Sequence, residues 1–162
     1  MNFLLGGYKR YAKYMLQSPP QAVAHLRGSP AYPELTGTVS FFPVPEGVLV
    51  VTEVRGLPAT ADGFFGLHIH DGTACTGDAP DPFAGAKTHY NPAGSPHPQH
   101  AGDLPPLLFA GGRAYACVLT DRFTISDILG KTVVLHDHPD DFRTQPAGDS
   151  GAKIACGVIY KR

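Results

Sequence analysis

The chain has 162 residues and a formal net charge of −1, with 13 basic and 14 acidic side chains. That length suits a single domain with one buried core. The balanced charge provides no field that would gather nucleic acid or an anionic membrane surface, so neither is expected as a partner. No apolar stretch approaches the roughly 20 residues that a membrane-spanning helix needs, so membrane insertion is not expected.

The first 20 residues are expected to form an N-terminal arm, followed by one domain at residues 21–162. The helical i, i+3, i+4, i+7 spacing is followed by Tyr8, Tyr11, Ala12 and Met15. It favours a helical arm that docks on the domain or at an interface, with a frayed tail as the alternative. The segment has neither a basic region before an apolar stretch nor a small-residue cleavage site. As it stands the chain is expected to be cytoplasmic, or secreted if a signal peptide has been removed.

Short runs of β-branched and aromatic residues, bounded by Gly, Pro, Asn or Asp, recur from residue 21 onward and are typical of strands. We predict strands at residues 21–27, 36–43, 47–55, 64–70, 106–110, 113–119, 132–136 and 153–160. Tight links such as "PVPEG" and "GG" are expected to join neighbours as hairpins. The pattern predicts an all-β fold, an eight-stranded antiparallel Greek-key β-barrel or sandwich of immunoglobulin-like architecture.

Two connections, residues 71–105 and 137–152, are longer than most loops of a compact domain. Loops of this length are usually functional. Each begins directly after a histidine at the end of a predicted strand, His70 and His136. We therefore expect the functional site where these loops leave the sheet.

The segment "GLHIH" places His68 and His70 two residues apart on a strand, so both side chains project from one face while Leu67 and Ile69 face the core. Such a pair offers two imidazole nitrogens to a metal ion. Taken alone it is also compatible with two exposed histidines on an edge strand. Imidazole ligands suit Cu(II), and His136 could supply a third nitrogen.

A second set of candidate ligands follows in "THYNPAGSPHPQHAGD": His89, His97, His100 and Asp103. Three nitrogens and one carboxylate suit tetrahedral zinc, and a closed set of this kind would be structural. The prolines of the segment stiffen it and lower the entropy lost when it orders around an ion. The three cysteines have no CxxC spacing, and they allow one disulfide plus one free thiol.

The ordered motifs "GLHIH", "THYNP", "HAGDL", "GKTVVLHDHPDD" and "GAKIACGVI" resemble copper/zinc superoxide dismutase over residues 21–160, in a bacterial-like form. The resemblance implies copper ligands His68, His70, His89 and His136, and zinc ligands His89, His97, His100 and Asp103. It implies that His89 bridges the two metals and carries a proton in the reaction. It also implies that Asp140 links the two sites through non-ligating nitrogens, as partners of metal-bound histidines commonly do. The implied disulfide joins Cys75 to Cys156.

The chain departs from the family pattern in three places. His100 follows His97 by only three positions, so the zinc loop is compressed, and the loop at residues 137–152 is short for the family and holds few cations. The active-site arginine of the family is replaced by Lys153, which keeps the charge but loses the planar fork of donors. We expect Lys153 to attract and orient the anion, the alternative being a solvated lysine that only adds charge.

The resemblance implies an enzyme that converts superoxide to O2 and H2O2 by cycling copper between Cu(II) and Cu(I), beside an imidazolate-bridged zinc. The alternatives are a non-catalytic copper- or zinc-binding module of the same fold and a β domain that uses zinc only for stability. A homodimer is a candidate assembly. Three residues are assigned no role at the metals: His25 as structural, His138 as solvated, and Cys117 as a small buried apolar side chain.

Overall fold

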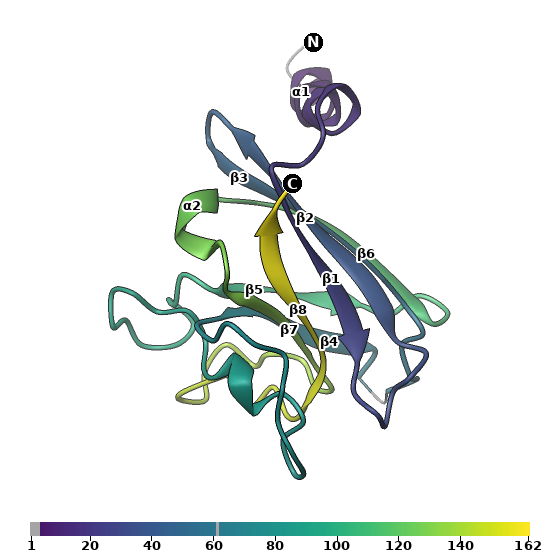
Figure 1. Cartoon of the computed structure of the whole chain (residues 1–162). Helices are drawn as coiled ribbons and strands as arrows, with labels where there is room; N and C mark the ends of the chain where they lie inside the picture. Colours follow the sequence, from purple (N-terminus) through teal and green to yellow (C-terminus); the bar gives the residue numbers. More distant parts are fainter. Residues whose placement is uncertain (1–3, 61) are drawn as a thin grey trace.

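The computed structural model describes the backbone of residues 4–60 and 62–162, with side chains from Tyr11 onward. Eight antiparallel strands form one sheet with the hydrogen-bonded order β5-β4-β7-β8-β1-β2-β3-β6, curled into a nearly closed barrel (Figure 1). The strands are β1 (Ala22–Gly28), β2 (Thr36–Val44), β3 (Gly47–Arg55), β4 (Phe64–His70), β5 (Asp103–Leu108), β6 (Arg113–Thr120), β7 (Thr132–His136) and β8 (Lys153–Lys161). The predicted fold class is confirmed.

The barrel interior is filled by alternate side chains of all eight strands. Phe41, Phe65 and Ile69 are fully buried there, within one cluster that also contains Leu26, Leu135 and Ile159. Burial of such side chains stabilises the fold by about 1.5–3 kcal/mol each. Every second residue of β4 therefore points inward, which leaves His68 and His70 on the outer face of the barrel wall.

The ends of seven predicted strands agree with the observed strands to within one residue. The exception is β5, predicted at residues 106–110 and observed at Asp103–Leu108. Phe65 pairs with Leu107 and Leu67 with Leu104, so two residues of β5 oppose one residue of β4. This bulge contains Pro105 and Pro106, which lack the N–H that a regular ladder requires.

Both predicted tight turns are present. Val44 pairs with Gly47 across a two-residue turn between β2 and β3. Ala110 and Arg113 exchange backbone hydrogen bonds across Gly111 and Gly112, both of which have positive φ angles. However, β5 and β6 lie at opposite ends of the hydrogen-bonded order. The "GG" turn thus brings the two sheet edges together without a ladder between them.

A helix, α1 (Leu4–Gln17), precedes the barrel and projects beside the β2–β3 end (Figure 1). The helix agrees with the helical spacing of Tyr8, Tyr11, Ala12 and Met15. The expectation for residues 1–3 lies outside the described part of the chain. Two short helices were not predicted: η1 (Ala84–Ala86) in the first long loop and α2 (Ile125–Ile128) before β7. A capping box of Thr124 and Asp127 starts α2, and a four-residue helix gives no periodic pattern to detect.

Cys117 is exposed and free, so the expectation of a buried apolar role was wrong. It lies on β6, where inward and outward residues alternate, and Ala114 occupies a core-facing position. The three-residue step from Ala114 to Cys117 places the thiol on the opposite, outer face. Apolar residues occupy both faces of β6, Ala114, Ala116 and Val118 on one and Tyr115, Cys117 and Leu119 on the other, so the sequence does not reveal which face is inside.

Candidate metal centre

The seven candidate ligands lie together against the outer face of β4 and β7, beneath the two long loops at the lower end of the barrel in Figure 1. Strand β4 is internal, paired with β5 on one side and β7 on the other, which excludes the edge-strand alternative for His68 and His70. All seven are at most 9% exposed: His68, His70, His89, His97, His100, Asp103 and His136. Buried imidazoles need polar or metal partners.

The first cluster consists of His68, His70, His89 and His136, with one ligand atom of each within 4.8 Å of the others. His70 Nε2 lies 3.2 Å from His136 Nε2. The rings of His68 and His89 are stacked with centroids 3.9 Å apart. Strands β4 and β7 supply three of these residues, and the first long loop supplies the fourth.

Oxygen acceptors fix the orientation of each strand histidine of this cluster. His70 Nδ1 donates to the carbonyl of Lys87 at 2.9 Å, and His136 Nδ1 approaches the carbonyl of Gly151 at 3.4 Å. Because a carbonyl only accepts, these contacts assign the protons to Nδ1 and the lone pairs to the Nε2 atoms. Two lone pairs 3.2 Å apart repel each other unless a cation lies between them. The arrangement is therefore that of two metal ligands.

The second cluster consists of His89, His97, His100 and Asp103. The Asp103 carboxylate lies 2.7 Å from His89 Nδ1, 3.0 Å from His97 Nδ1 and 3.2 Å from His100 Nδ1. The β5 bulge has a role here, because it places Asp103 directly opposite His68 on β4. His89 belongs to both clusters: Nδ1 faces Asp103, which leaves Nε2 for the first cluster.

Asp140, in the second long loop, connects the two clusters. Its Oδ2 accepts from His68 Nε2 and its Oδ1 from His97 Nε2, both at 2.9 Å. Each imidazole then presents its Nδ1 lone pair to its own cluster. The structure thus gives Asp140 the contacts that the resemblance implied.

Burial and mutual contacts shift the pKa values in a consistent direction. Burial lowers the pKa of His68, His70 and His136, to about 3 for His136, and neighbouring imidazoles add to the effect. Burial alone would raise the pKa of Asp140, but the hydrogen bonds from His68, Phe142 and His97 together lower it to about 2. Neutral imidazoles and ionised carboxylates are the forms that bind metals.

One observation in particular shows that the residues of the two clusters suit two metal ions. Four buried ring nitrogens make no hydrogen bond: His68 Nδ1, His89 Nε2, His97 Nδ1 and His100 Nδ1, the last two of which lie 3.0 and 3.2 Å from the Asp103 carboxylate without hydrogen-bond geometry. All of them belong to the two clusters, and an unpartnered buried polar atom costs about 1–3 kcal/mol. Imidazole donors of this type suit copper in the first cluster, and three imidazoles with one carboxylate suit zinc in the second.

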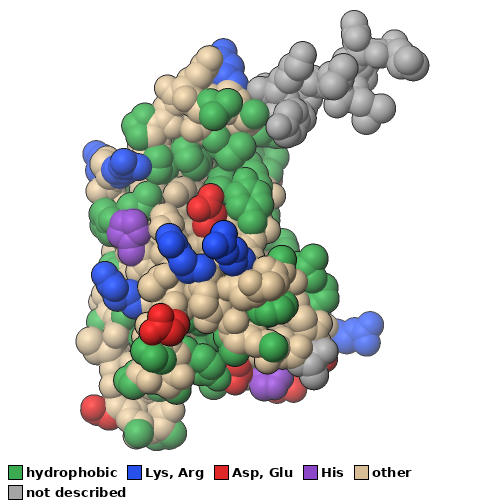
Figure 2. All heavy atoms as spheres, turned by 90° about the vertical axis from the view of Figure 1, so that its right-hand side faces the viewer, with side chains coloured by type: hydrophobic (Ala, Val, Ile, Leu, Met, Phe, Trp, Pro, Cys, Tyr) green, Lys and Arg blue, Asp and Glu red, His purple; other side chains and the backbone are tan. Residues whose placement is uncertain are grey.

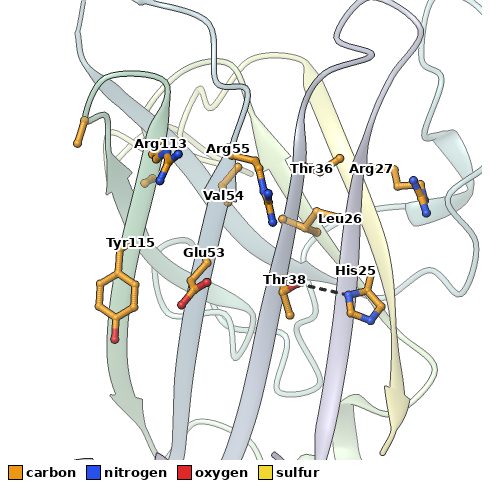
Figure 3. Close-up of a pocket in the computed structure, with 13 residues that line it drawn as sticks. His25, Leu26, Arg27, Thr36, Thr38, Glu53, Val54, Arg55, Arg113 and Tyr115 are labelled. Atoms are coloured by element: carbon orange, nitrogen blue, oxygen red, sulfur yellow. Dashed lines mark hydrogen bonds between the residues drawn. The ribbon is translucent and has the colours of Figure 1, made fainter.

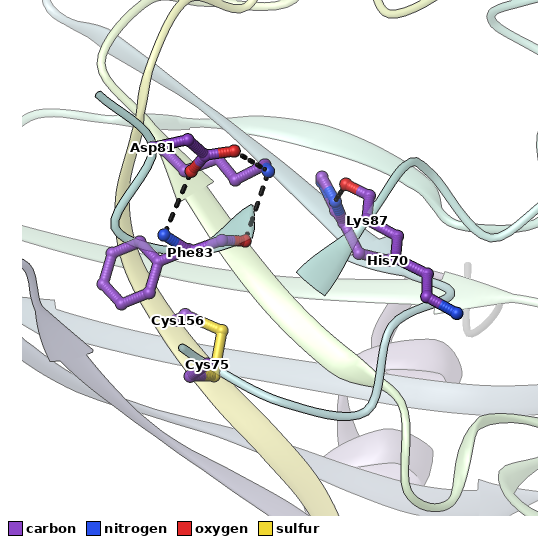
Figure 4. Close-up of a disulfide and its surroundings, with 7 residues drawn as sticks. His70, Cys75, Asp81, Phe83, Lys87 and Cys156 are labelled. Carbon is purple, nitrogen blue, oxygen red and sulfur yellow. Dashed lines mark hydrogen bonds and ion pairs between the residues drawn. A yellow bond between two sulfur atoms is a disulfide. The ribbon is translucent and has the colours of Figure 1, made fainter. Parts of the chain in front are cut away.

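Lys153, at the start of β8, has a partner that the sequence did not reveal. Its Nζ donates to Asp81 Oδ2 at 2.6 Å and to the carbonyl of Phe83 at 3.2 Å. Asp81 and Phe83 lie in the first loop beside the disulfide between Cys75 and Cys156 (Figure 4). Lys153 on β8 pairs with His136 on β7, which places its side chain next to the first cluster.

Three other residues support the site without a sequence signal. Gln145 bonds the backbone of His97 at both its N–H and its carbonyl, which ties the two long loops together. The Arg122 guanidinium donates to the carbonyls of Pro98 and His100, at 3.1 and 3.2 Å. Gly148 has φ +68°, and a Cβ there would collide with Asp140. The contacts of Gln145 and Arg122 join residues 48 and 22 positions apart in the chain.

The remaining histidines lie outside the clusters. His25 is exposed on β1, and His138 is exposed and paired with Asp137 at 2.7 Å. A groove of about 680 Å³ on the outer face of β1, β2, β3 and β6 is lined by His25, Glu53 and Tyr115 among others (Figure 3). It contains none of the candidate ligands. The site is therefore defined by its donor atoms and not by the size of a cavity.

Residues 35–159 match the family model described as copper/zinc superoxide dismutase (SODC). The chain belongs to this family. It is 37% identical over 145 residues to superoxide dismutase [Cu-Zn] of Deinococcus radiodurans, covering 78% of each chain. It is 35% identical over 141 residues to superoxide dismutase [Cu-Zn] 2 of Aquifex aeolicus, covering 78% of this chain and 80% of that one.

A solved structure of the family, the Cu/Zn superoxide dismutase from Brucella abortus, aligns with a TM-score of 0.70. The alignment covers 85% of this chain and 98% of that chain at 24% identity, which shows the shared fold. Family membership confirms the prediction of a superoxide dismutase, an oxidoreductase with copper and zinc as cofactors. Superoxide is the substrate of the family.

Proposed function

We propose that this chain dismutates superoxide at a copper ion bound by His68, His70, His89 and His136, next to a zinc ion bound by His89, His97, His100 and Asp103. The observation that carries the assignment is the set of oxygen acceptors on the outer ring nitrogens. These acceptors turn the opposite lone pairs of the strand and loop histidines toward two common points. The four unpartnered nitrogens lie at those points.

Copper held by these four histidines would supply one-electron redox chemistry, by which two superoxides and two protons give O2 and H2O2. The chain must supply a proton close to the reduced product. His89 Nε2 suits this role, because the ring is held through Nδ1 against Asp103 while Nε2 has no hydrogen-bond partner. We assign to Nε2 the transfer of one of the two protons.

Lys153 is the cation that we assign to anion capture. Its side chain is 16% exposed, and Lys153 pairs with His136 of the first cluster across β7 and β8. In a partly buried setting a unit charge acts over several ångströms more strongly than in bulk water. Replacing Lys153 by Met should therefore lower the second-order rate of dismutation without changing metal content.

Dismutation by protein reconstituted with copper and zinc tests the proposal directly. Rates should be measured by pulse radiolysis, with metal content determined in the same samples. We expect activity that depends on both metals and falls in Lys153→Met. A fully loaded protein without dismutase activity would instead favour the non-catalytic metal-binding module.

We further propose that two copies associate as a homodimer. Large apolar side chains that are more than half exposed support this, namely Leu16, Leu108 and Tyr115. Light scattering at micromolar concentration tests the dimer.

On the face shown in Figure 2, cationic and anionic side chains are interspersed, which does not favour a polyanionic partner. Within the described residues, no helix is long and apolar enough to cross a membrane.

A further inference from the structure

The ion pair between Lys153 and Asp81 bears on how the site captures its anion. The Lys153 side chain is 16% exposed and the Asp81 side chain 42% exposed, so the pair is open to solvent on the carboxylate side. The ammonium group has two partners, the carboxylate of Asp81 and the carbonyl of Phe83. It is thus held at the first loop, near the first cluster.

Asp81 is itself fixed in place and is not a freely rotating surface side chain. Its Oδ1 accepts from the backbone N–H of Phe83 at 3.0 Å while Oδ2 binds Lys153. Phe83 is buried against Ala86, Val134 and Cys156, and Cys156 is bonded to Cys75 of the same loop. The carboxylate is therefore held against the ammonium by a short turn, a buried ring and a disulfide (Figure 4).

We propose that Asp81 restrains anion capture by competing with superoxide for the ammonium group of Lys153. This inference rests on the proposed function. A paired ammonium and carboxylate present a dipole, whose field falls off faster with distance than that of a single charge. The incoming anion must displace the carboxylate to reach Lys153. Because Asp81 is partly solvated, separating its Oδ2 from the ammonium carries a small penalty, while the Oδ1 hydrogen bond keeps the carboxylate at the turn as a competitor and the Phe83 carbonyl keeps the ammonium in position.

The replacement Asp81→Asn tests the effect of the negative charge of Asp81 alone. Asparagine keeps an oxygen that can accept from the Phe83 N–H, so the turn is retained, but the negative charge next to Lys153 is lost. We expect the second-order rate of the copper- and zinc-loaded enzyme to rise about threefold at low ionic strength. The gain should shrink as salt increases, since screening acts over about 8 Å at physiological ionic strength.

A second readout does not depend on turnover. Azide binding to the Cu(II) form, followed by its absorption band, should be about threefold tighter in Asp81→Asn than in wild type. Asp78→Asn is the matched control, because Asp78 lies three residues away in the same loop, is exposed and lacks an ion pair with any described residue. It should leave both readouts unchanged. In the Lys153→Met background, Asp81→Asn should also have no effect on either.

The outcomes separate this inference from the proposed function. If Lys153→Met slows the enzyme but Asp81→Asn changes neither rate nor azide affinity, the competition is refuted while the guiding role of Lys153 stands. A lower rate and weaker azide binding in Asp81→Asn would also overturn it, and would make Asp81 a positioning residue for Lys153. If wild type shows no dismutation, the proposed function fails, and azide binding still decides whether Asp81 masks Lys153.

Discussion

At the scale of single residues, the site depends on groups that do not bind metal. A histidine can present either ring nitrogen, and for four of the candidate ligands a hydrogen bond at the opposite nitrogen decides which one. Two backbone carbonyls and the Asp140 carboxylate make those choices for His68, His70, His97 and His136. The orientation of these imidazole rings therefore depends on oxygen atoms that contact the histidines but are not themselves candidate metal ligands.

Replacing Asp140 by Asn should weaken both metal sites. In the amide one of the two acceptor oxygens becomes an NH2 group that cannot accept, and the oxygen that remains is a neutral, weaker acceptor than a carboxylate, so the contacts that fix His68 and His97 are both weakened. We expect copper and zinc affinities to fall roughly 10- to 100-fold in chelator competition. Asp141→Asn, an equal charge change at the adjacent exposed residue, should leave both affinities near wild type. Loss of affinity for one metal alone would contradict the bridging role.

The metal-free protein should lose stability as the pH falls below about 6.5. Burial lowers the pKa of His68, His70 and His136 below their ordinary value of 6.5, to about 3 for His136, so in this window the unfolded chain binds more protons than the folded one. The free energy of unfolding then decreases with decreasing pH. The lowered pKa values of Asp103 and Asp140 act in the same direction below about pH 3.8.

Urea unfolding of metal-free protein at a series of pH values measures this effect. The free energy of unfolding should depend less steeply on pH in His136→Asn. One buried imidazole then no longer contributes to the difference in proton binding between the folded and the unfolded chain. An unchanged slope in that variant, or a stability that rises toward pH 4, would show that the buried histidines do not control acid stability.

At the scale of elements, strands position most of the proposed copper ligands and the first long loop supplies most of the proposed zinc ligands. The first long loop is attached to the barrel by the disulfide, by a β-bridge between His70 and His89, and by Arg122. Gln145 joins it to the second loop. Polar loops are thus held by many weak contacts and one covalent bond.

Removing the disulfide should destabilise the protein much more than removing the free thiol. Cys75 and Cys156 are 81 residues apart, and closing a loop of that length contributes roughly 4 kcal/mol in the chain-entropy model. Cys75→Ser should therefore lower the free energy of unfolding by up to that amount in denaturant titrations. Cys117→Ser is the control, and it should change stability by less than about 0.5 kcal/mol because the thiol is exposed and unpaired. Equal effects would contradict the assignment.

At the scale of the whole molecule, we propose that residues 1–20 are an arm that the barrel does not need. The β1 strand begins at Ala22, and Gln21 already bonds to Phe41 and Arg162 of the barrel. Deleting residues 1–20 should leave the copper and zinc content, the circular dichroism spectrum and the per-subunit rate unchanged. A change in mass by light scattering would place the arm in a subunit contact. Loss of metal would show that the arm supports the site.

The sequence by itself determined the strands, the fold class and the ligand candidates. Strand alternation and turn residues are local signals, and the HxH pair, the histidine-rich loop and His136 are chemically distinctive at any position. The start of β5 was missed because two prolines concealed a bulge, and Cys117 was misplaced because apolar residues on both faces of β6 give no alternation that identifies the inner face.

Only the tertiary structure decided which contacts control the ligands. Asp81 meets Lys153 across 72 residues, Gln145 meets His97 across 48, and the Gly151 carbonyl faces His136 across 15. A single aspartate, glutamine or carbonyl has no distinguishing pattern in the sequence, since its effect depends on where the barrel and the disulfide bring distant loops together. Charge pairing and ring orientation are properties of that three-dimensional proximity, which local sequence does not encode.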